Sequence, residues 1–129
     1  MSEDRGQALV EFALVLPVLL VVALAIGELS ELGVARLALT HAAAEGARTI
    51  ALTKDDRLGR TSVAAASAPL RSSAIEVSIE PPAEQRGNDP RGTLVLVRLR
   101  YALSTPLSFV GLPTLFVRGE AARSMEWTP

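Results

Sequence analysis

The chain has 129 residues and a formal net charge of −1 at pH 7. This length suits one small domain, and the near-neutral charge gives no reason to expect a nucleic-acid partner. There is no cysteine, which excludes disulfides, cysteine nucleophiles and thiolate metal sites. Hydrophobic residues make up 49% of the chain, and much of this share lies in one N-terminal block and one alanine-rich stretch.

The N-terminal block is the only stretch of the sequence that is apolar enough to cross a membrane. No residue from Phe12 to Gly27 is charged. As a helix this run would cover about 24 Å, which is less than the hydrocarbon core of about 30 Å. Spanning therefore also needs residues 8–10, and this requirement draws Glu11 toward the membrane. A plain anchor would have no use for a carboxylate at that position.

Helical periodicity continues beyond the apolar block. Small or apolar residues recur three or four positions apart and form one helix face; they are Leu32, Ala35, Leu39, Ala42, Gly46 and Ile50. We therefore predict one continuous helix from about Gln7 to about Leu52, apolar in its first half and amphipathic in its second. Residues 53–57 end it, and a shorter helix is predicted over residues 58–70, ending before Pro69.

The rest of the sequence has the period of β-strands. Residues 74–80 and 93–101 alternate apolar and polar side chains, and a loop rich in Pro and Gly separates them at 81–92. A last strand is predicted over 114–127, with Gly119 as a possible bulge. Three successive strands indicate an antiparallel meander. The predicted fold is therefore α+β, with the amphipathic helix on the apolar face of a small sheet.

Three interpretations of the N-terminal segment remain open on these residues alone. A signal anchor explains the apolar block but leaves Glu11 unexplained. A cleavable secretory signal would use the small residues at 23–25 and give a mature start at Ile26, although Glu3 and Asp4 are unusual in the region before the apolar run. The third interpretation uses the residues around Glu11.

The stretch from Gly6 to Phe12 resembles a prepilin processing site. In such sites a Gly precedes the cut, a Glu lies five residues after it beside an aromatic residue, and an apolar helix follows. The resemblance implies that Gly6 precedes the cut, that Gln7 is the new N-terminus, and that Glu11 and Phe12 form the recognition and assembly pair. A charge at the centre of a membrane helix costs roughly 2.5–3.5 kcal/mol, so Glu11 would need a partner, which in pilin assembly is thought to be the N-terminal amine of a neighbouring subunit.

The resemblance extends further along the chain. The segments "GQALVEFALVLPVLL", "IGELSELG" and "ALTHAAAEGARTIAL" together resemble the TadE-like family, pseudopilins of the tight-adherence (Flp, type IVb) pilus system. Membership implies a minor pilus component that acts in pilus biogenesis, adherence and biofilm formation. The implied partners are a prepilin peptidase, other pilins and pseudopilins, the assembly platform and the lipid bilayer.

The same resemblance implies a single-pass protein of the cell membrane. Residues 1–6 would be a prepilin-type leader on the cytoplasmic side, residues 7–28 a transmembrane helix, and residues 29–129 an extracytoplasmic domain. It leaves open whether the protein enters the fibre. The rival interpretation is an unprocessed, membrane-anchored module that binds another protein outside the membrane.

The remaining polar residues indicate packing and surface pairs. Within Glu45-Gly46-Ala47-Arg48 the two small residues would allow close packing against the sheet or a partner helix. The single histidine, His41, is expected at the helix surface, and Asp55 and Asp56 in a helix-ending loop. Arginines on two strands are expected to be neutralised by nearby glutamates; they are Arg98, Arg100, Arg118 and Arg123, with Glu76, Glu80 and Glu120. No catalytic, metal or cofactor residues are predicted, and no enzymatic activity.

Overall fold

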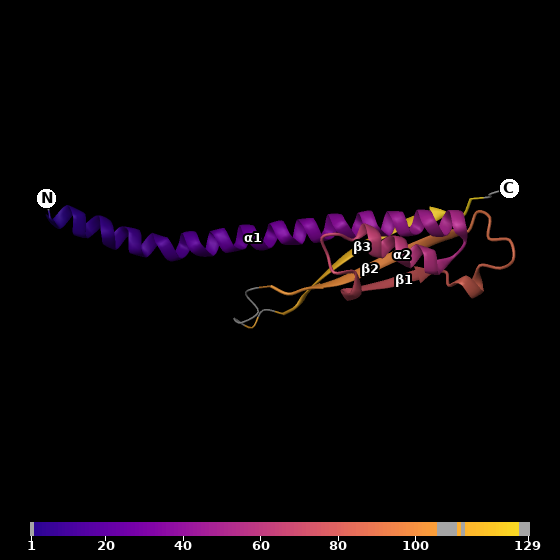
Figure 1. Cartoon of the computed structure of the whole chain (residues 1–129). Helices are drawn as coiled ribbons and strands as arrows, with labels where there is room; N and C mark the ends of the chain where they lie inside the picture. The colour runs from indigo at the N-terminus through magenta and orange to yellow at the C-terminus, as the bar shows by residue number, and fades with distance from the viewer. Residues whose placement is uncertain (1, 106–110, 112, 127–129) are drawn as a thin grey trace. The chain divides into compact units, whose positions relative to one another are not determined.

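The computed structural model describes residues 2–105, 111 and 113–126, and the chain divides into two units, Met1–Glu31 and Leu32–Pro129. Its helices are α1 (Ser2–Thr53) and α2 (Asp56–Ala66), and its strands are β1 (Ile75–Glu80), β2 (Leu94–Leu103) and β3 (Leu115–Ser124) (Figure 1). Short 3-10 turns lie at Ser72–Ala74 and Ala83–Gln85. The predicted α+β fold, a long N-terminal helix with a three-stranded antiparallel sheet, is confirmed.

The first unit consists of the N-terminal part of α1. The helix begins at Ser2 rather than near Gln7 as predicted, so the expected leader is already helical. Asp4 stands in its first turn, where negative charge is favoured by the helix dipole. The helix continues through Pro17, whose missing N–H leaves one carbonyl without its helical donor.

The second unit begins with the last turns of α1, which end at a sharp reversal. Lys54 follows the helix with a φ of 61°, and its N–H donates to the Ile50 carbonyl at 2.8 Å, as in the left-handed cap that ends many helices. Asp55 then caps α2, because its Oδ1 accepts from the N–H groups of Arg57 at 2.8 Å and Leu58 at 3.4 Å. This cap starts α2 two residues before the predicted Leu58, and the helix ends at Ala66 rather than beside Pro69.

The left-handed backbone at Lys54 predicts a stabilising substitution. A residue with a β-carbon loses about 1–2 kcal/mol in this conformation, and glycine avoids the loss at a smaller entropic cost. Lys54→Gly is therefore expected to stabilise the fold by about 0.5–1 kcal/mol, measured as a higher Tm of the full chain in detergent. Lys54→Ala, which keeps the β-carbon, should give no such gain; an equal gain in both variants would contradict this explanation.

The three strands form an antiparallel sheet in the order β1-β2-β3, as predicted. Ile75 pairs with Tyr101 at one end of the β1–β2 ladder, and Leu103 pairs with Leu115 at the hairpin end of β2 and β3. Odd-numbered residues point to the face that the helices cover, called here the inner face, and even-numbered residues point to the exposed outer face. β2 extends two residues beyond the predicted Tyr101. The last predicted strand residue, Trp127, lies outside the described residues.

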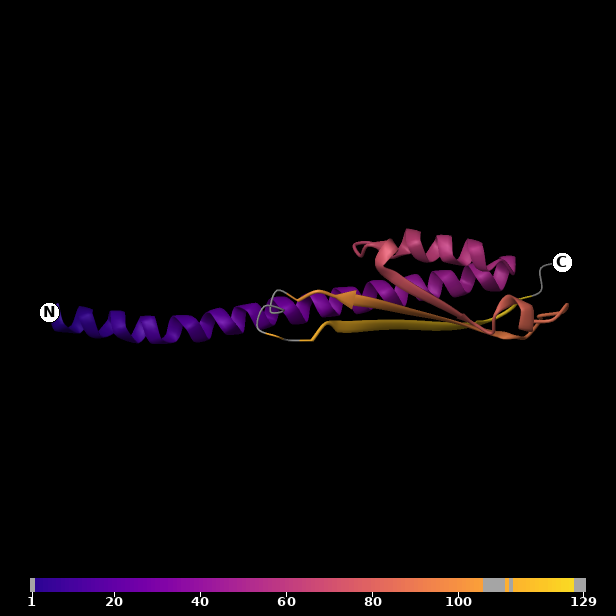
Figure 2. The same ribbon diagram turned by 90° about the horizontal axis from the view of Figure 1, so that it is seen from below.

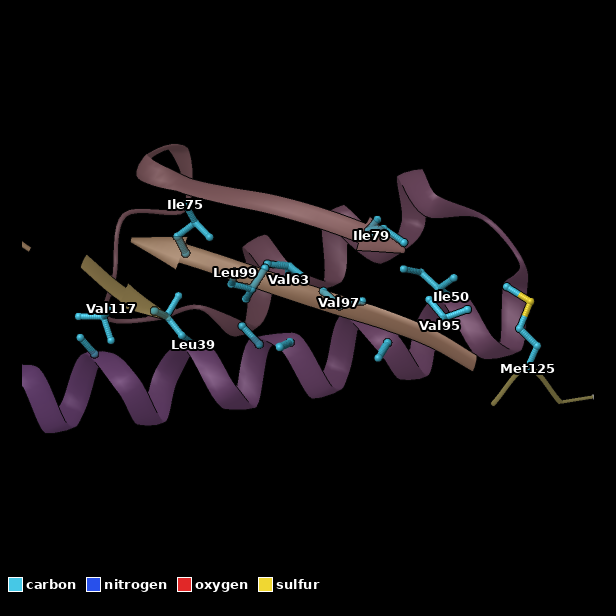
Figure 3. Close-up of a cluster of buried hydrophobic side chains, with 14 residues drawn as sticks. Leu39, Ile50, Val63, Ile75, Ile79, Val95, Val97, Leu99, Val117 and Met125 are labelled. Carbon is cyan, nitrogen blue, oxygen red and sulfur yellow. The ribbon is translucent and has the colours of Figure 1, made fainter. Parts of the chain in front are cut away.

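The core lies between the inner face and the two helices of the second unit. Leu39 and Ile50 of α1 pack with Val63 of α2 and with strand residues such as Val97 and Leu99, all nearly inaccessible to solvent (Figure 3). The predicted stripe on α1 is confirmed, since five of its six residues are buried and Leu32 is partly buried.

Gly119 is not a bulge. It pairs with Leu99 in an uninterrupted register, and the prediction of an irregular strand there is wrong. Its missing side chain instead admits the backbone of α1: a β-carbon built on Gly119 would lie 2.6 Å from the carbonyl carbon of Leu39 and 2.8 Å from its oxygen. Glycine is therefore needed here for the close approach of a helix to a strand.

Candidate functional site

The expected processing site lies on an accessible helix. Gly6 and Gln7 are helical and exposed, and a β-carbon built on Gly6 would meet nothing within 4 Å. A peptidase needs an extended peptide bond, so the helix must open locally before a cut after Gly6. The bond lies close to the helix start, where the first four N–H groups have no helical partner and opening has a low free-energy cost.

Glu11 and Phe12 stand at the beginning of a fully exposed apolar surface. Phe12 is 59% exposed, and the large apolar side chains from Leu9 to Ile26 are all exposed as well. Among the residues that the structure describes, one helix, Asp4–Thr53, is long and apolar enough to cross a membrane. In water such a surface would be strongly unfavourable, so the first unit is suited to a lipid bilayer or to other apolar helices.

Gly46 and Ala47 pack inside the second unit. α2 runs antiparallel to the last part of α1 (Figure 2), and the two helices meet where Gly46 faces Val63 and Gly59 faces Ile50. A β-carbon on Gly46 would lie 2.5 Å from Val63 Cγ2 and 3.8 Å from Val97 Cγ1. The small residues of this motif therefore serve the contact with α2 and the sheet in this chain.

The charged residues of the same motif point away from the core. Glu45 is half-buried and Arg48 is exposed, and the described side chains of the two form no ion pair with each other. Arg48 lines a hollow of about 280 Å³ together with Ala51, Leu52, Arg123 and Glu126. The motif thus combines two packing residues with two surface residues.

His41 lies on the surface of α1, as predicted. It borders an apolar hollow of about 400 Å³ whose lining includes Val34, Leu37 and Pro69. Within residues 2–105, 111 and 113–126, no three His, Asp or Glu side chains are grouped in a way that could hold a metal ion.

The adjacent aspartates act on different elements. Asp55 caps α2, as described above, and Asp56 forms an ion pair with Arg86, whose side chain is only 4% exposed. Arg86 donates from Nη1 and Nη2 to the two carboxylate oxygens at 2.5 and 3.1 Å, and from Nε to the Pro81 carbonyl at 2.8 Å. This contact was not predicted, because a lone arginine in a polar loop carries no periodic signal.

A second pair lies on the surface of the same loop. Arg91 donates from Nε to Asp89 Oδ1 at 2.6 Å, and this hydrogen bond lowers the pKa of the Asp89 carboxyl below its usual value and raises the pKa of Arg91. Both side chains are more than half exposed, so the pair adds little to stability.

The predicted neutralisation of the strand arginines is confirmed for two of them on the outer face. Arg98 pairs with Glu80 at 2.9 Å and Glu120 at 3.5 Å, and Arg100 approaches Glu76 at 3.8 Å. Arg118 instead stands beside Arg100 in the ladder. Arg123 has the odd-numbered inner-face orientation and does not join this set, so grouping it with Arg118 was wrong.

The comparisons with known proteins bear on the N-terminal segment. The model of the family described as "TadE-like protein" matches residues 6–48, which begin at Gly6 and end with the Glu45–Arg48 motif. Searches of curated proteins and of solved structures gave no significant match. The predicted resemblance is therefore confirmed for residues 6–48, which are similar to the TadE-like family over about a third of the chain.

Proposed function

We propose that the chain is a minor pseudopilin of the tight-adherence system, with no enzymatic role, cut between Gly6 and Gln7. Residues 7–28 would then span the cell membrane, with residues 29–129 on the extracytoplasmic side. One observation carries the proposal: the exposed apolar stretch of α1 follows directly after Gly6 and Gln7 and holds a single carboxylate, Glu11, before Glu28.

In this proposal Glu11 is an assembly residue. Cleavage creates a charged amine at Gln7, and the same amine on a neighbouring subunit supplies the partner that a carboxylate needs in an apolar environment. Two unit charges about 4 Å apart attract by about 4 kcal/mol at an intermediate dielectric constant. The pair would offset the cost of burying Glu11 and would fix the axial register between subunits, while small residues of the helix favour close helix contacts in lipid.

The test is the N-terminus and intact mass of the protein from cells with and without the prepilin peptidase. A start at Gln7 that depends on the peptidase is the expected result. Glu11→Ala should reduce co-purification with other pilins, because it leaves the amine of the neighbour unpaired. Glu31→Ala removes an exposed carboxylate outside the apolar run and should leave that association unchanged.

Two other outcomes would replace the proposal. A start at Met1 or Ser2 in both strains would indicate an unprocessed, membrane-anchored binding module. A start at Ile26 would indicate a secreted domain released by signal peptidase.

A further inference from the structure

We propose that the edge of β3 that faces away from β2, called here the β3 edge, binds an extended strand of another protein. The partner strand carries an acidic side chain opposite Arg118 and extends the sheet by one strand. The backbone groups that would bind it belong to Phe116, Arg118, Glu120 and Ala122. The inference goes beyond the proposed function and does not depend on cleavage after Gly6.

The hydrogen bonds of the ladder show which backbone groups of β3 point outward. In an antiparallel pair, residues that bond to the neighbouring strand alternate with residues that point away from it. The Met125 N–H donates to the Thr93 carbonyl at 2.9 Å, and these two residues continue the register of β2 and β3. Odd-numbered residues of β3 therefore bond to β2, and even-numbered residues direct their N–H and C=O groups to the β3 edge. In agreement with this pattern, the Glu126 N–H points away from β2 and donates to the Ala51 carbonyl.

The opposite edge of the sheet, on β1, is partly closed. β1 has six residues and is followed directly by Pro81 and Pro82. Arg60 of α2 donates from Nη1 to the Val77 carbonyl at 3.1 Å, so a helix side chain already occupies an outward acceptor of this strand. Short strands, prolines and covering side chains are among the features that protect a sheet edge from pairing.

The β3 edge is longer and open. β3 has ten residues, contains no proline and keeps an uninterrupted register with β2. In the part of the chain that the structure describes, no further backbone group bonds to the outward N–H and C=O groups from Phe116 to Ala122. These groups recur at every second residue, which is the pattern that an added strand needs in order to bind through its own backbone.

The charges on the outer face indicate the chemistry of the partner. Glu76, Arg100 and Arg118 lie side by side at one level of the sheet, and like charges directly opposite each other are destabilising. Glu76 lies 3.8 Å from Arg100, whereas none of the described carboxylates forms an ion pair with Arg118. An added strand would place one residue directly opposite Arg118, on the side away from Arg100. An acidic residue at that position would balance the second arginine, as Glu76 balances the first.

The neighbours of Arg118 are already engaged in contacts of their own. The Arg100 guanidinium lies 3.8 Å from the centroid of the Phe116 ring, and Glu120 pairs with Arg98 at 3.5 Å. Arg118 is exposed, and its planar guanidinium can donate two parallel hydrogen bonds to one carboxylate. It is therefore the side chain of the β3 edge that best selects an acidic partner.

A second copy of the chain is the less suitable occupant. The backbone of α1 lies directly over β3, since a β-carbon on Gly119 would be 2.6 Å from the carbonyl carbon of Leu39. Neighbouring strands are about 4.8 Å apart, so two β3 edges paired near Gly119 would bring two α1 helices to about that separation. Packed helices need about 8–10 Å between their axes. The partner is therefore an extended segment with no helix over its own edge.

The test adds a probe strand to the C-terminus of the full chain and measures amide hydrogen exchange at single residues by NMR in detergent micelles. The probe has about nine residues, alternately threonine and valine, with glutamate in place of the central threonine. A flexible linker of about fifteen glycine and serine residues has a root-mean-square length of about 20 Å and gives the probe a millimolar effective concentration at the edge. The matched control probe has glutamine at its centre.

The expected result is an alternating pattern along β3. Without a probe, the amides of Arg118 and Glu120 should exchange faster than those of Val117 and Gly119, because the latter two bond to β2. The glutamate probe should slow exchange at Arg118 and Glu120 severalfold. The protection should be about two- to fivefold greater than with the glutamine probe, which is the usual effect of a cross-strand ion pair.

Two variants of the chain show which arginine selects the acidic probe. Arg118→Gln should abolish the difference between the two probes, because it removes the charge opposite the central residue. Arg123→Gln removes an exposed arginine from the same strand on its inner face and should leave the difference unchanged.

Several outcomes would overturn the inference. Fast exchange at Arg118 and Glu120 with both probes would show that the β3 edge does not accept a strand. Equal protection by both probes, or a preference for glutamate that survives Arg118→Gln, would overturn the acidic partner. Slow exchange without any probe would show that the edge is already covered, by the chain itself, or by a second copy if the protection rises with protein concentration. Each readout is separate from the N-terminus at Gln7, so the proposed function stands or fails independently.

Discussion

Replacing Gly119 by alanine is expected to destabilise the second unit by about 3 kcal/mol, at the upper end of the range for overpacked cores. The new methyl group would lie 2.6 Å from the carbonyl carbon of Leu39, 2.7 Å from its β-carbon and 2.8 Å from its oxygen. Two of these atoms belong to the backbone, so the contact can be relieved only if α1 moves away from β3. The measurement is the Tm of the full chain in detergent, followed through the loss of β-structure by circular dichroism.

Two other glycines provide graded controls. In Gly46→Ala the new methyl group would meet a side-chain atom, Val63 Cγ2, which can yield by a rotation, and alanine gains about 1 kcal/mol in helix propensity; its cost should be smaller. In Gly33→Ala the methyl group meets nothing within 4 Å. The Tm should therefore stay unchanged, or rise because alanine has the higher helix propensity. If Gly119→Ala is as stable as Gly33→Ala, the helix does not approach the strand as closely as described.

The elements of this fold could be predicted because their residues repeat with a clear period. The stripe from Leu32 to Ile50 has helical spacing, and the alternation through Val95, Val97 and Leu99 is that of a strand with one buried face. Strands that follow each other in the sequence usually pair with each other, so three strands in succession favour a meander. The fold class, the strand order and the covering helix all follow from these local patterns.

Contacts between elements were harder to predict. Gly119 can equally mark a bulge or a close approach of backbone, and only the position of Leu39 decides between them. The role of Gly46 was left between the sheet and a partner helix for the same reason. The start of α1 at Ser2 was missed because the polar residues before Gln7 carry no apolar period, although acidic residues suit a first helical turn.

In the candidate site, too, contacts that follow from local patterns could be predicted and contacts between distant segments could not. The neutralising partners of Arg98 and Arg100 could be predicted, because cross-strand neighbours follow from strand order and register. Arg123 was wrongly grouped with Arg118, because successive residues of a strand point to opposite faces and an odd-numbered residue does not share the face of an even-numbered one. The partner of Asp56 could not be predicted, since Arg86 lies thirty residues away in a loop and the geometry that joins them arises only in the folded chain.

That ion pair joins the β1–β2 loop to the first turn of α2. Arg86 is nearly inaccessible, and the Asp56 carboxylate and the Pro81 carbonyl together accept hydrogen bonds from three of its nitrogens. Asp56 also stands at the N-terminus of α2, where negative charge is favoured. Removing the carboxylate would leave a buried guanidinium with one backbone acceptor, and an uncompensated buried charge is far more costly than the loss of a surface pair.

Asp56→Ala is therefore expected to destabilise the chain by about 3 kcal/mol, against about 1 kcal/mol for its neighbour Asp55→Ala, which removes a helix cap. Adding Arg86→Met to Asp56→Ala should recover part of the loss, because the double variant no longer buries an unpaired charge. The free energies come from urea unfolding of the full chain in detergent at one pH. Equal losses in the two aspartate variants, or a double variant no more stable than Asp56→Ala, would show that Arg86 does not depend on this carboxylate.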